Sequence, residues 1–152
     1  MSVEEVTVTG GAGVVEVPGG QPPQRPDLAP ALRIALATGQ LRRPLSETLR
    51  PLLSMLVDGR YKVTGPGRIA EEWADPVPTD NWPPDDEDRV TYYRTAISTG
   101  HRPVAVLLND GPERRGFILD GHHKIAAYQA ENMLPWVIRI AKITEDAQPA
   151  VN

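Results

Sequence analysis

The chain contains no cysteine, which excludes disulfide bonds, thiolate metal sites and catalysis by a thiol. Aromatic residues make up only 5% of it, and together with 13 glycines and 16 prolines this indicates extensive loops. No apolar stretch approaches the roughly 20 residues that a membrane-spanning helix requires. The segment Met1–Glu5 is acidic where a secretory signal is basic. We therefore expect a cytoplasmic protein that does not enter a membrane.

An excess of basic residues is lacking as well. Lys and Arg number 16 against 20 Asp and Glu, which gives a net charge of -4. Proteins that bind nucleic acids broadly usually concentrate basic residues on one face. We therefore do not expect a broad, non-specific nucleic-acid-binding face, and local basic patches stay open. With 152 residues and 40% apolar content, the chain is long enough for one domain with its own core.

Composition divides the chain into four segments. Residues 1–27 alternate valine with threonine or glutamate around a glycine cluster, which is typical of a small hairpin, of an ordered edge element or of a flexible tail. Residues 28–79 are predicted to form a mainly helical N-terminal extension. Residues 80–143 show the most regular pattern and are predicted to form the core, and residues 144–152 are a C-terminal tail.

Local patterns predict two helices and a strand in the extension. Leu28, Leu32 and Leu36 have helical spacing, and Gly39 is expected to end that helix. A second helix is expected at 48–57. A short strand at 61–64 should then lead into a turn at 65–67 and a further helical turn at 68–73.

The core segment has the pattern of an α+β fold. Asp85 can cap a helix in which Val90, Tyr93 and Ile97 share one face, and Gly100 is expected to end it. Continuous apolar runs bounded by turn residues are typical of buried strands. The remaining predicted elements are two strands at 104–108 and 117–119, a helix at 122–131 and a final strand at 136–143.

The run Asp120-Gly121-His122-His123-Lys124 is the strongest functional signal in the sequence. It follows an apolar strand and opens a helix, so that two histidines and a lysine fall in the first helical turn. Backbone N–H groups at a helix N-terminus already favour an anion. The run therefore predicts an anion-binding turn.

This run and an upstream pattern resemble the superfamily of ParB-type partition proteins, sulfiredoxins and free-serine kinases. Ile97, Gly100 and Pro103 precede a strand as in the first conserved box of that superfamily. Residues 120–124, followed by Ala126-Ala127, resemble the second box, which binds nucleotide phosphates. The resemblance covers under half of the chain and implies a ParB/sulfiredoxin-like mixed small sheet with packed helices. The residues before it would be an addition to that fold.

The chain is similar in sequence to the sulfiredoxins but lacks the thiol on which their reaction depends. The run Ala126-Ala127-Tyr128-Gln129 reproduces the helix that follows the second box in sulfiredoxins. His122 stands where the essential thiol of those enzymes would be, so reduction of a sulfinic acid through a cysteine intermediate is excluded.

The same comparison assigns phosphate contacts. His123 and Lys124 are similar to a phosphate-binding histidine and arginine, and Arg89 is similar to a phosphate-contacting lysine. Tyr92 and Ala96 stand at positions where sulfiredoxins carry hydroxyl groups. A lysine supplies a point charge where an arginine supplies a fork, so the phosphate geometry would differ.

The free-serine kinases share the Asp-Gly-His-His motif and imply catalysis. By this resemblance Asp120 is a general base or a magnesium ligand, and Asp120 and His123 are the catalytic residues. The cofactor would be Mg with ATP or another nucleotide, and the acceptor is an unknown small molecule or protein. An upstream acidic residue would assist, for which the candidates are Glu71, Glu72 and Asp75. The predicted phosphate- and nucleotide-binding residues are Gly121, His122, His123, Lys124, Arg89, His101 and Arg102.

Several alternatives stay open at this point. The pocket could belong to a non-catalytic module that senses a nucleotide or docks on a partner, or to a nuclease, which the acidic charge opposes. Asp120 could simply be an N-cap residue. A metal site made of Asp120, His122 and His123 lacks the i, i+4 histidine spacing of helical zinc sites. Only nine residues follow Ile143, so we expect neither the DNA-reading and dimerisation segments of ParB proteins nor specific DNA binding.

Overall fold

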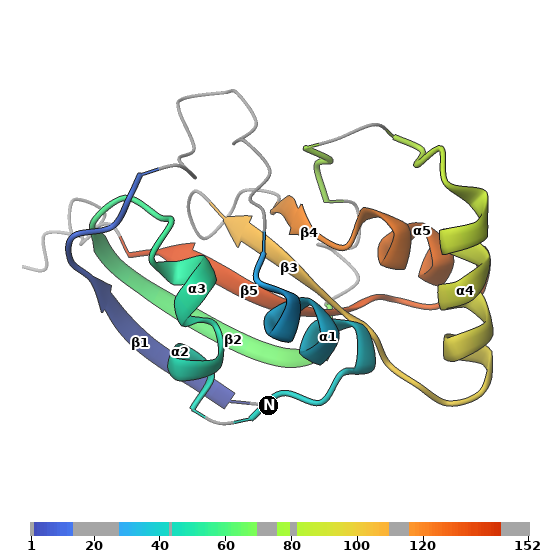
Figure 1. Cartoon of the computed structure of the whole chain (residues 1–152), viewed down its shortest axis with the longest axis horizontal. Helices are drawn as coiled ribbons and strands as arrows, with labels where there is room; N and C mark the ends of the chain where they lie inside the picture. The colour runs from blue at the N-terminus through green and yellow to red at the C-terminus, as the bar shows by residue number, and fades with distance from the viewer. Residues whose placement is uncertain are drawn as a thin grey trace, which may run out of the picture.

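A computed structural model describes residues 2–13, 28–42, 44–69, 76–79, 82–109 and 116–143. In chain order, its elements are β1 (Ser2–Val8), α1 (Pro30–Thr38), α2 (Leu45–Thr48), α3 (Arg50–Leu53), β2 (Gly59–Arg68), α4 (Glu87–Ser98), β3 (Val104–Asn109), β4 (Phe117–Asp120), α5 (His122–Ala130) and β5 (Trp136–Lys142) (Figure 1). Helices and strands alternate irregularly around one sheet, so the predicted α+β class is confirmed.

The sheet has five strands in the order β1-β2-β5-β3-β4. β3 and β5 run parallel, and α5 lies between β4 and β5 in the chain; every other neighbouring pair is antiparallel. β4 is an edge strand, and it receives a single bridge from Val77 to Phe117 in the segment 76–79. The C-terminal end of β4 leads directly into α5, which places the turn at Asp120-Gly121 at this edge.

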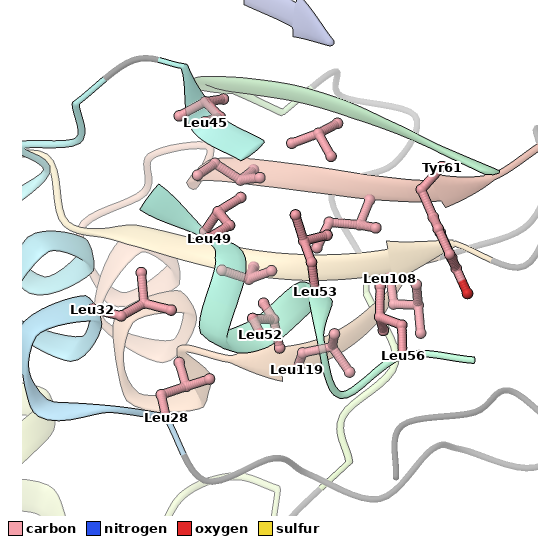
Figure 2. Close-up of a cluster of buried hydrophobic side chains, with 14 of the residues drawn as sticks. Leu28, Leu32, Leu45, Leu49, Leu52, Leu53, Leu56, Tyr61, Leu108 and Leu119 are labelled. Carbon is pink, nitrogen blue, oxygen red and sulfur yellow. The ribbon is translucent and has the colours of Figure 1, made fainter. Parts of the chain in front are cut away.

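One face of the sheet is covered by the three N-terminal helices. Leu45, Leu49, Leu52 and Leu56 follow one another at helical spacing, and each is fully buried. They pack with leucines of α1 and with alternate residues of β2, β3 and β5 (Figure 2). Burying a leucine contributes about 1.5–3 kcal/mol, so this leucine layer is a main source of stability.

The opposite face of β3 is covered by α5. Ala105 and Leu107 of β3 pack with Ile125 of α5, whereas Val104, Val106 and Leu108 face the leucine layer. Both faces of β3 are therefore buried, which explains its continuous apolar sequence. α4 lies beside α5 (Figure 1), and a third cluster forms between these two helices from Tyr93, Ile97, Ala127 and Tyr128.

The predictions for the second half of the chain are confirmed, with small shifts of the boundaries. Val104–Asn109, Phe117–Asp120 and Trp136–Lys142 are strands, and His122–Ala130 is a helix. The helix predicted to be capped by Asp85 instead has Asp86 as its N-cap, whose carboxylate accepts the Arg89 N–H at 3.1 Å.

The first half departs from prediction at two places. The helix expected at 48–57 is two short helices, α2 and α3, although its leucines keep one buried face. The turn expected at 65–67 and the start of the helical turn at 68–73 belong instead to β2, which runs on to Arg68. The register of β2 against β5 shifts between Thr64 and Gly67, so a β-bulge absorbs the glycines.

The N-terminal strand is ordered as a sheet edge rather than as a hairpin of its own. β1 pairs with β2 along its whole length. The Glu4 carboxylate accepts the N–H groups of Leu45 at 2.6 Å and Ser46 at 3.0 Å, so β1 also caps α2. The extension predicted at 28–79 as mainly helical thus contributes β2 to the same sheet as the predicted core at 80–143.

Several predictions fall outside the described residues. These are the tail at 144–152, most of the segment between β1 and α1, and the acidic candidates Glu71, Glu72 and Asp75. Within the part of the chain that the structure describes, no helix has the length and apolar character to cross a bilayer.

Candidate functional site

The turn from β4 into α5 depends on Gly121. This residue is the N-cap of α5 and has a left-handed φ of 107°. A Cβ at this position would lie 2.7 Å from the Cβ of Ala105 and 2.9 Å from its Cα. Glycine therefore allows both the backbone conformation and the close approach of α5 to β3. The alternative of Asp120 as the N-cap is wrong, because Gly121 occupies that position.

Asp120 instead forms an ion pair with Lys124. The Lys124 ammonium donates to Asp120 Oδ2 at 3.1 Å and to the Val104 carbonyl at 3.0 Å. Their side chains are only 5% and 16% exposed, for Lys124 and Asp120 respectively. A buried lysine is tolerated because it is paired and hydrogen-bonded. The pair ties the first turn of α5 to both β3 and β4.

Tyr93 brings α4 into the same arrangement. Its ring centroid lies 5.8 Å from Lys124 Nζ and 6.0 Å from the Arg89 guanidinium carbon, distances at which a cation is attracted by an aromatic face. Burial raises the pKa of the Tyr93 phenol above its ordinary value, partly opposed by the Arg89 charge and aided by Asp120. Tyr93 is therefore a neutral buried side chain that holds two cationic groups near each other.

A pocket opens at this point, beside the end of β4. The cavity itself is small, about 20 Å³, and it opens directly to solvent. Five of its lining residues were predicted from the sequence, namely Arg89, Asp120, Gly121, His123 and Lys124. Two more, Arg33 and Tyr93, complete the lining. The structure thus brings together residues of α1, α4, β4 and α5.

His122 lies elsewhere, although it is adjacent to His123 in the motif. The residue is 2% exposed, and its Nε2 accepts the Thr79 N–H at 2.9 Å. A ring nitrogen that accepts a backbone N–H carries no proton of its own. His122 therefore fastens the segment 76–79 to α5, and Trp82 lies beside it at 6.4 Å between ring centroids. The ring is not part of the pocket lining.

The predicted contacts after the first box also lie away from the pocket. His101 is exposed. The Arg102 guanidinium donates to the carbonyls of Ile97 at 3.1 Å and His101 at 2.7 Å, so it stabilises the end of α4. Tyr92 points outward and is 65% exposed, with its ring 5.2 Å from that of Tyr93.

Arg33 is the lining residue that sequence reasoning missed. It lies on α1, far from the motif in the chain, and nothing in its local sequence distinguishes it from other exposed arginines. Leu32 and Leu36 anchor α1 in the leucine layer. Ala37, one turn after Arg33, packs against the cluster between α4 and α5. The two helix layers therefore meet at the pocket, where Arg33 enters it.

The charges of the pocket suit an anion. Arg33, Arg89 and Lys124 are cationic, and among the described lining residues Asp120 is the single carboxylate. Among the described residues, no group of three or more His, Cys, Asp and Glu side chains could hold a metal ion by itself. A magnesium ion needs only one or two carboxylates when phosphate oxygens complete its shell, and Asp120 is the residue that would supply one.

Comparisons with models of protein families, with curated proteins and with solved structures give no match for this chain.

Proposed function

We propose that the protein binds a nucleotide through its phosphate groups in the pocket at the start of α5. The observation that carries this proposal is the convergence of Arg89, His123 and Lys124 on one pocket beside the N-terminal turn of a helix. Arginine, lysine and backbone N–H groups are the usual ligands of phosphate in proteins. The resemblance of the motif to nucleotide-binding boxes supports the same function.

Thermal unfolding with ATP, ADP, CTP and GTP, each with and without magnesium, tests this proposal. A ligand at about 100 times its Kd stabilises the folded state by about 2.7 kcal/mol. In a chain of 152 residues, this raises Tm by roughly 5–10 °C. If no nucleotide raises Tm at millimolar concentration, the proposal is wrong.

Variants locate the binding site. Arg89→Ala and His123→Ala remove groups that line the pocket. Arg50→Ala is a matched control, because Arg50 is an exposed arginine of α3 outside the lining. We expect both pocket variants to reduce the nucleotide-dependent rise in Tm and the control to retain it. An equal response of all three variants would place binding elsewhere.

Asp120 decides whether catalysis follows binding. In phosphoryl transfer it would accept a proton from the acceptor or hold Mg²⁺, which supplies charge stabilisation to the phosphate oxygens when bound. Its contact with Lys124 at 3.1 Å occupies one carboxylate oxygen. This ion pair favours the second candidate function, a nucleotide-sensing or protein-interaction module without turnover.

A product assay separates these two functions. Phosphotransfer or hydrolysis predicts that ADP accumulates from ATP with magnesium, and that Asp120→Asn stops accumulation while binding persists. Sensing predicts that ATP binds and that no ADP accumulates with the wild type. The acceptor in such a transfer would be a small molecule or a protein.

A further inference from the structure

Arg33 enters the pocket from a part of the chain that carries none of the predicted site residues. α1 is held in place on two sides: Leu32 and Leu36 are 3% and 0% exposed in the leucine layer, and Ala37 packs against the α4–α5 cluster. Arg33 and Ala37 are four residues apart and therefore share a helix face. The backbone of Arg33 is thus fixed relative to α4 and α5.

The side chain of Arg33 forms no hydrogen bond or ion pair with the described residues. It is exposed, and no carboxylate or carbonyl in the described part of the chain pairs with its guanidinium. Arg89 likewise pairs with no carboxylate or carbonyl of the described residues, and its guanidinium contacts Tyr93. Lys124 differs, because Asp120 already offsets its charge. Two arginine side chains therefore line the pocket without an ion pair to a carboxylate of the described residues.

The depth of these cations differs along the pocket. Lys124 is almost completely buried at the first turn of α5, and His123 is half-buried next to it. Arg33 and Arg89 are exposed and stand at the rim. An anionic group held at the helix turn leaves the two arginines for a second anionic group farther out. Each guanidinium can bind two oxygens of one phosphate at once.

We propose that the ligand of this pocket carries at least two linked phosphate groups and that Arg33 binds the outer one. This inference rests on the phosphate-binding function proposed above and extends it to a substrate class. The inner phosphate lies against His123, Lys124 and the start of α5, and the outer phosphate lies between Arg33 and Arg89. Orthophosphate and nucleoside monophosphates lack the group that Arg33 recognises.

Calorimetric titration with orthophosphate, pyrophosphate, tripolyphosphate, AMP and ATP tests this inference on the full chain. Inorganic probes separate the number of phosphates from any contribution of the base. Arg33→Ala is compared with Arg42→Ala, which removes another exposed arginine of the N-terminal region outside the pocket. Arg33→Lys retains the charge and loses the fork. Because both arginines are exposed, Tm should stay close to that of the wild type.

We expect Arg33→Ala to raise the Kd for pyrophosphate, tripolyphosphate and ATP by about tenfold or more, which is the effect of losing a charge-assisted hydrogen bond. Arg33→Lys should fall between this variant and the wild type. The Kd for orthophosphate and for AMP should change by less than about twofold in Arg33→Ala. In Arg42→Ala the Kd for every probe should stay within about twofold, since this variant removes no ligand contact.

Three outcomes would overturn the inference, and they are distinguishable. If the wild type binds none of the probes, the phosphate-binding function fails and the role of Arg33 fails with it. If the wild type binds and Arg33→Ala behaves like Arg42→Ala, only the role of Arg33 is wrong. If Arg33→Ala weakens the binding of orthophosphate and pyrophosphate equally, Arg33 binds the inner phosphate, and the proposed ligand class with two linked phosphates is wrong.

Discussion

Replacing Gly121 by alanine tests the turn on which the pocket is built. The added Cβ would meet the Cβ of Ala105 at 2.7 Å and its Cα at 2.9 Å, in a backbone with φ of 107°. Both contacted atoms belong to a buried strand, so neither can swing away as the tip of a flexible side chain could. Either α5 or β3 has to shift.

The destabilisation expected for Gly121→Ala has two contributions, one from the backbone conformation and one from packing. A left-handed backbone costs an alanine about 1–2 kcal/mol, and forcing an extra carbon into a packed interior costs about 1–3 kcal/mol. Together they predict a loss of about 2–5 kcal/mol of unfolding free energy for Gly121→Ala. In a chain of 152 residues, each kcal/mol lowers Tm by about 2–4 °C.

Gly100→Ala is a matched control for the backbone contribution. Gly100 also has a positive φ, of 100°, and nothing lies within 4 Å of the added Cβ. It should therefore lose only the backbone part, about 1–2 kcal/mol. Urea unfolding of both variants measures the difference. In the Ala105→Gly background, Gly121→Ala should lose part of its packing cost, because the contact with the Ala105 Cβ is removed and the backbone contact at 2.9 Å remains.

The steric reasoning is refuted if Gly121→Ala unfolds no more easily than Gly100→Ala. A double variant without recovery would show that the strain does not come from the Ala105 Cβ. If Gly121→Ala is destabilised as expected and still binds nucleotide like the wild type, the position of α5 is not what shapes the pocket.

Three further predictions concern stability and binding. His122→Ala should lower the free energy of unfolding by about 1–3 kcal/mol, because the Thr79 N–H loses its acceptor, and it should leave phosphate binding unchanged. His123→Ala should weaken phosphate binding and leave stability unchanged. Urea unfolding and calorimetric titration of both variants measure the two effects. Leu52→Ala should cost about 2–5 kcal/mol in urea unfolding, since Leu52 is fully buried. Stability should fall above about pH 10, because the unfolded chain releases the Tyr93 proton at its ordinary pKa of 10.0 while burial raises that pKa in the folded state. Tyr93→Phe should flatten the decline of Tm with pH, and an unchanged slope contradicts this assignment.

The second half of the chain was predictable because its local and tertiary signals agree. Both faces of β3 are buried, so its apolar run has no polar interruption. Val90, Tyr93 and Ile97 have helical spacing, and they do face the interior between α4 and α5. Glycine before the histidine pair marks a turn by local chemistry alone, and the fold uses it there.

β2 was not predictable in full, because pairing overrides its local sequence. Gly65-Pro66-Gly67 has the composition of a turn, yet β1 pairs with β2 as far as Gly65 and β5 resumes its pairing at Gly67. A bulge absorbs the irregularity, and Gly65 fits because a Cβ there would lie 2.6 Å from the Val137 carbonyl oxygen. Such a position is recognised only when the neighbouring strands are known.

The candidate site divides in the same way. The motif predicts four lining residues that lie close together in sequence, namely Asp120, Gly121, His123 and Lys124. The different positions of the His122 and His123 side chains follow from packing, which the motif does not encode. His122 turns toward Thr79, which precedes the helix by more than 40 residues. Arg33 joins the pocket only through the packing of α1, and no local pattern carries that information.

The composite origin of the pocket bears on where the functional unit begins. The family resemblance starts at residue 80, yet β5 pairs with β2 and its Ile138 and Ile140 are buried by leucines of α2 and α3. A chain beginning at residue 80 would expose that face of β3 and β5 to water, at about 25 cal/mol for each Å² of apolar surface. It would also lack Arg33. The N-terminal segments therefore belong to the same folding unit as the motif, and the rim of the pocket is part of what they provide.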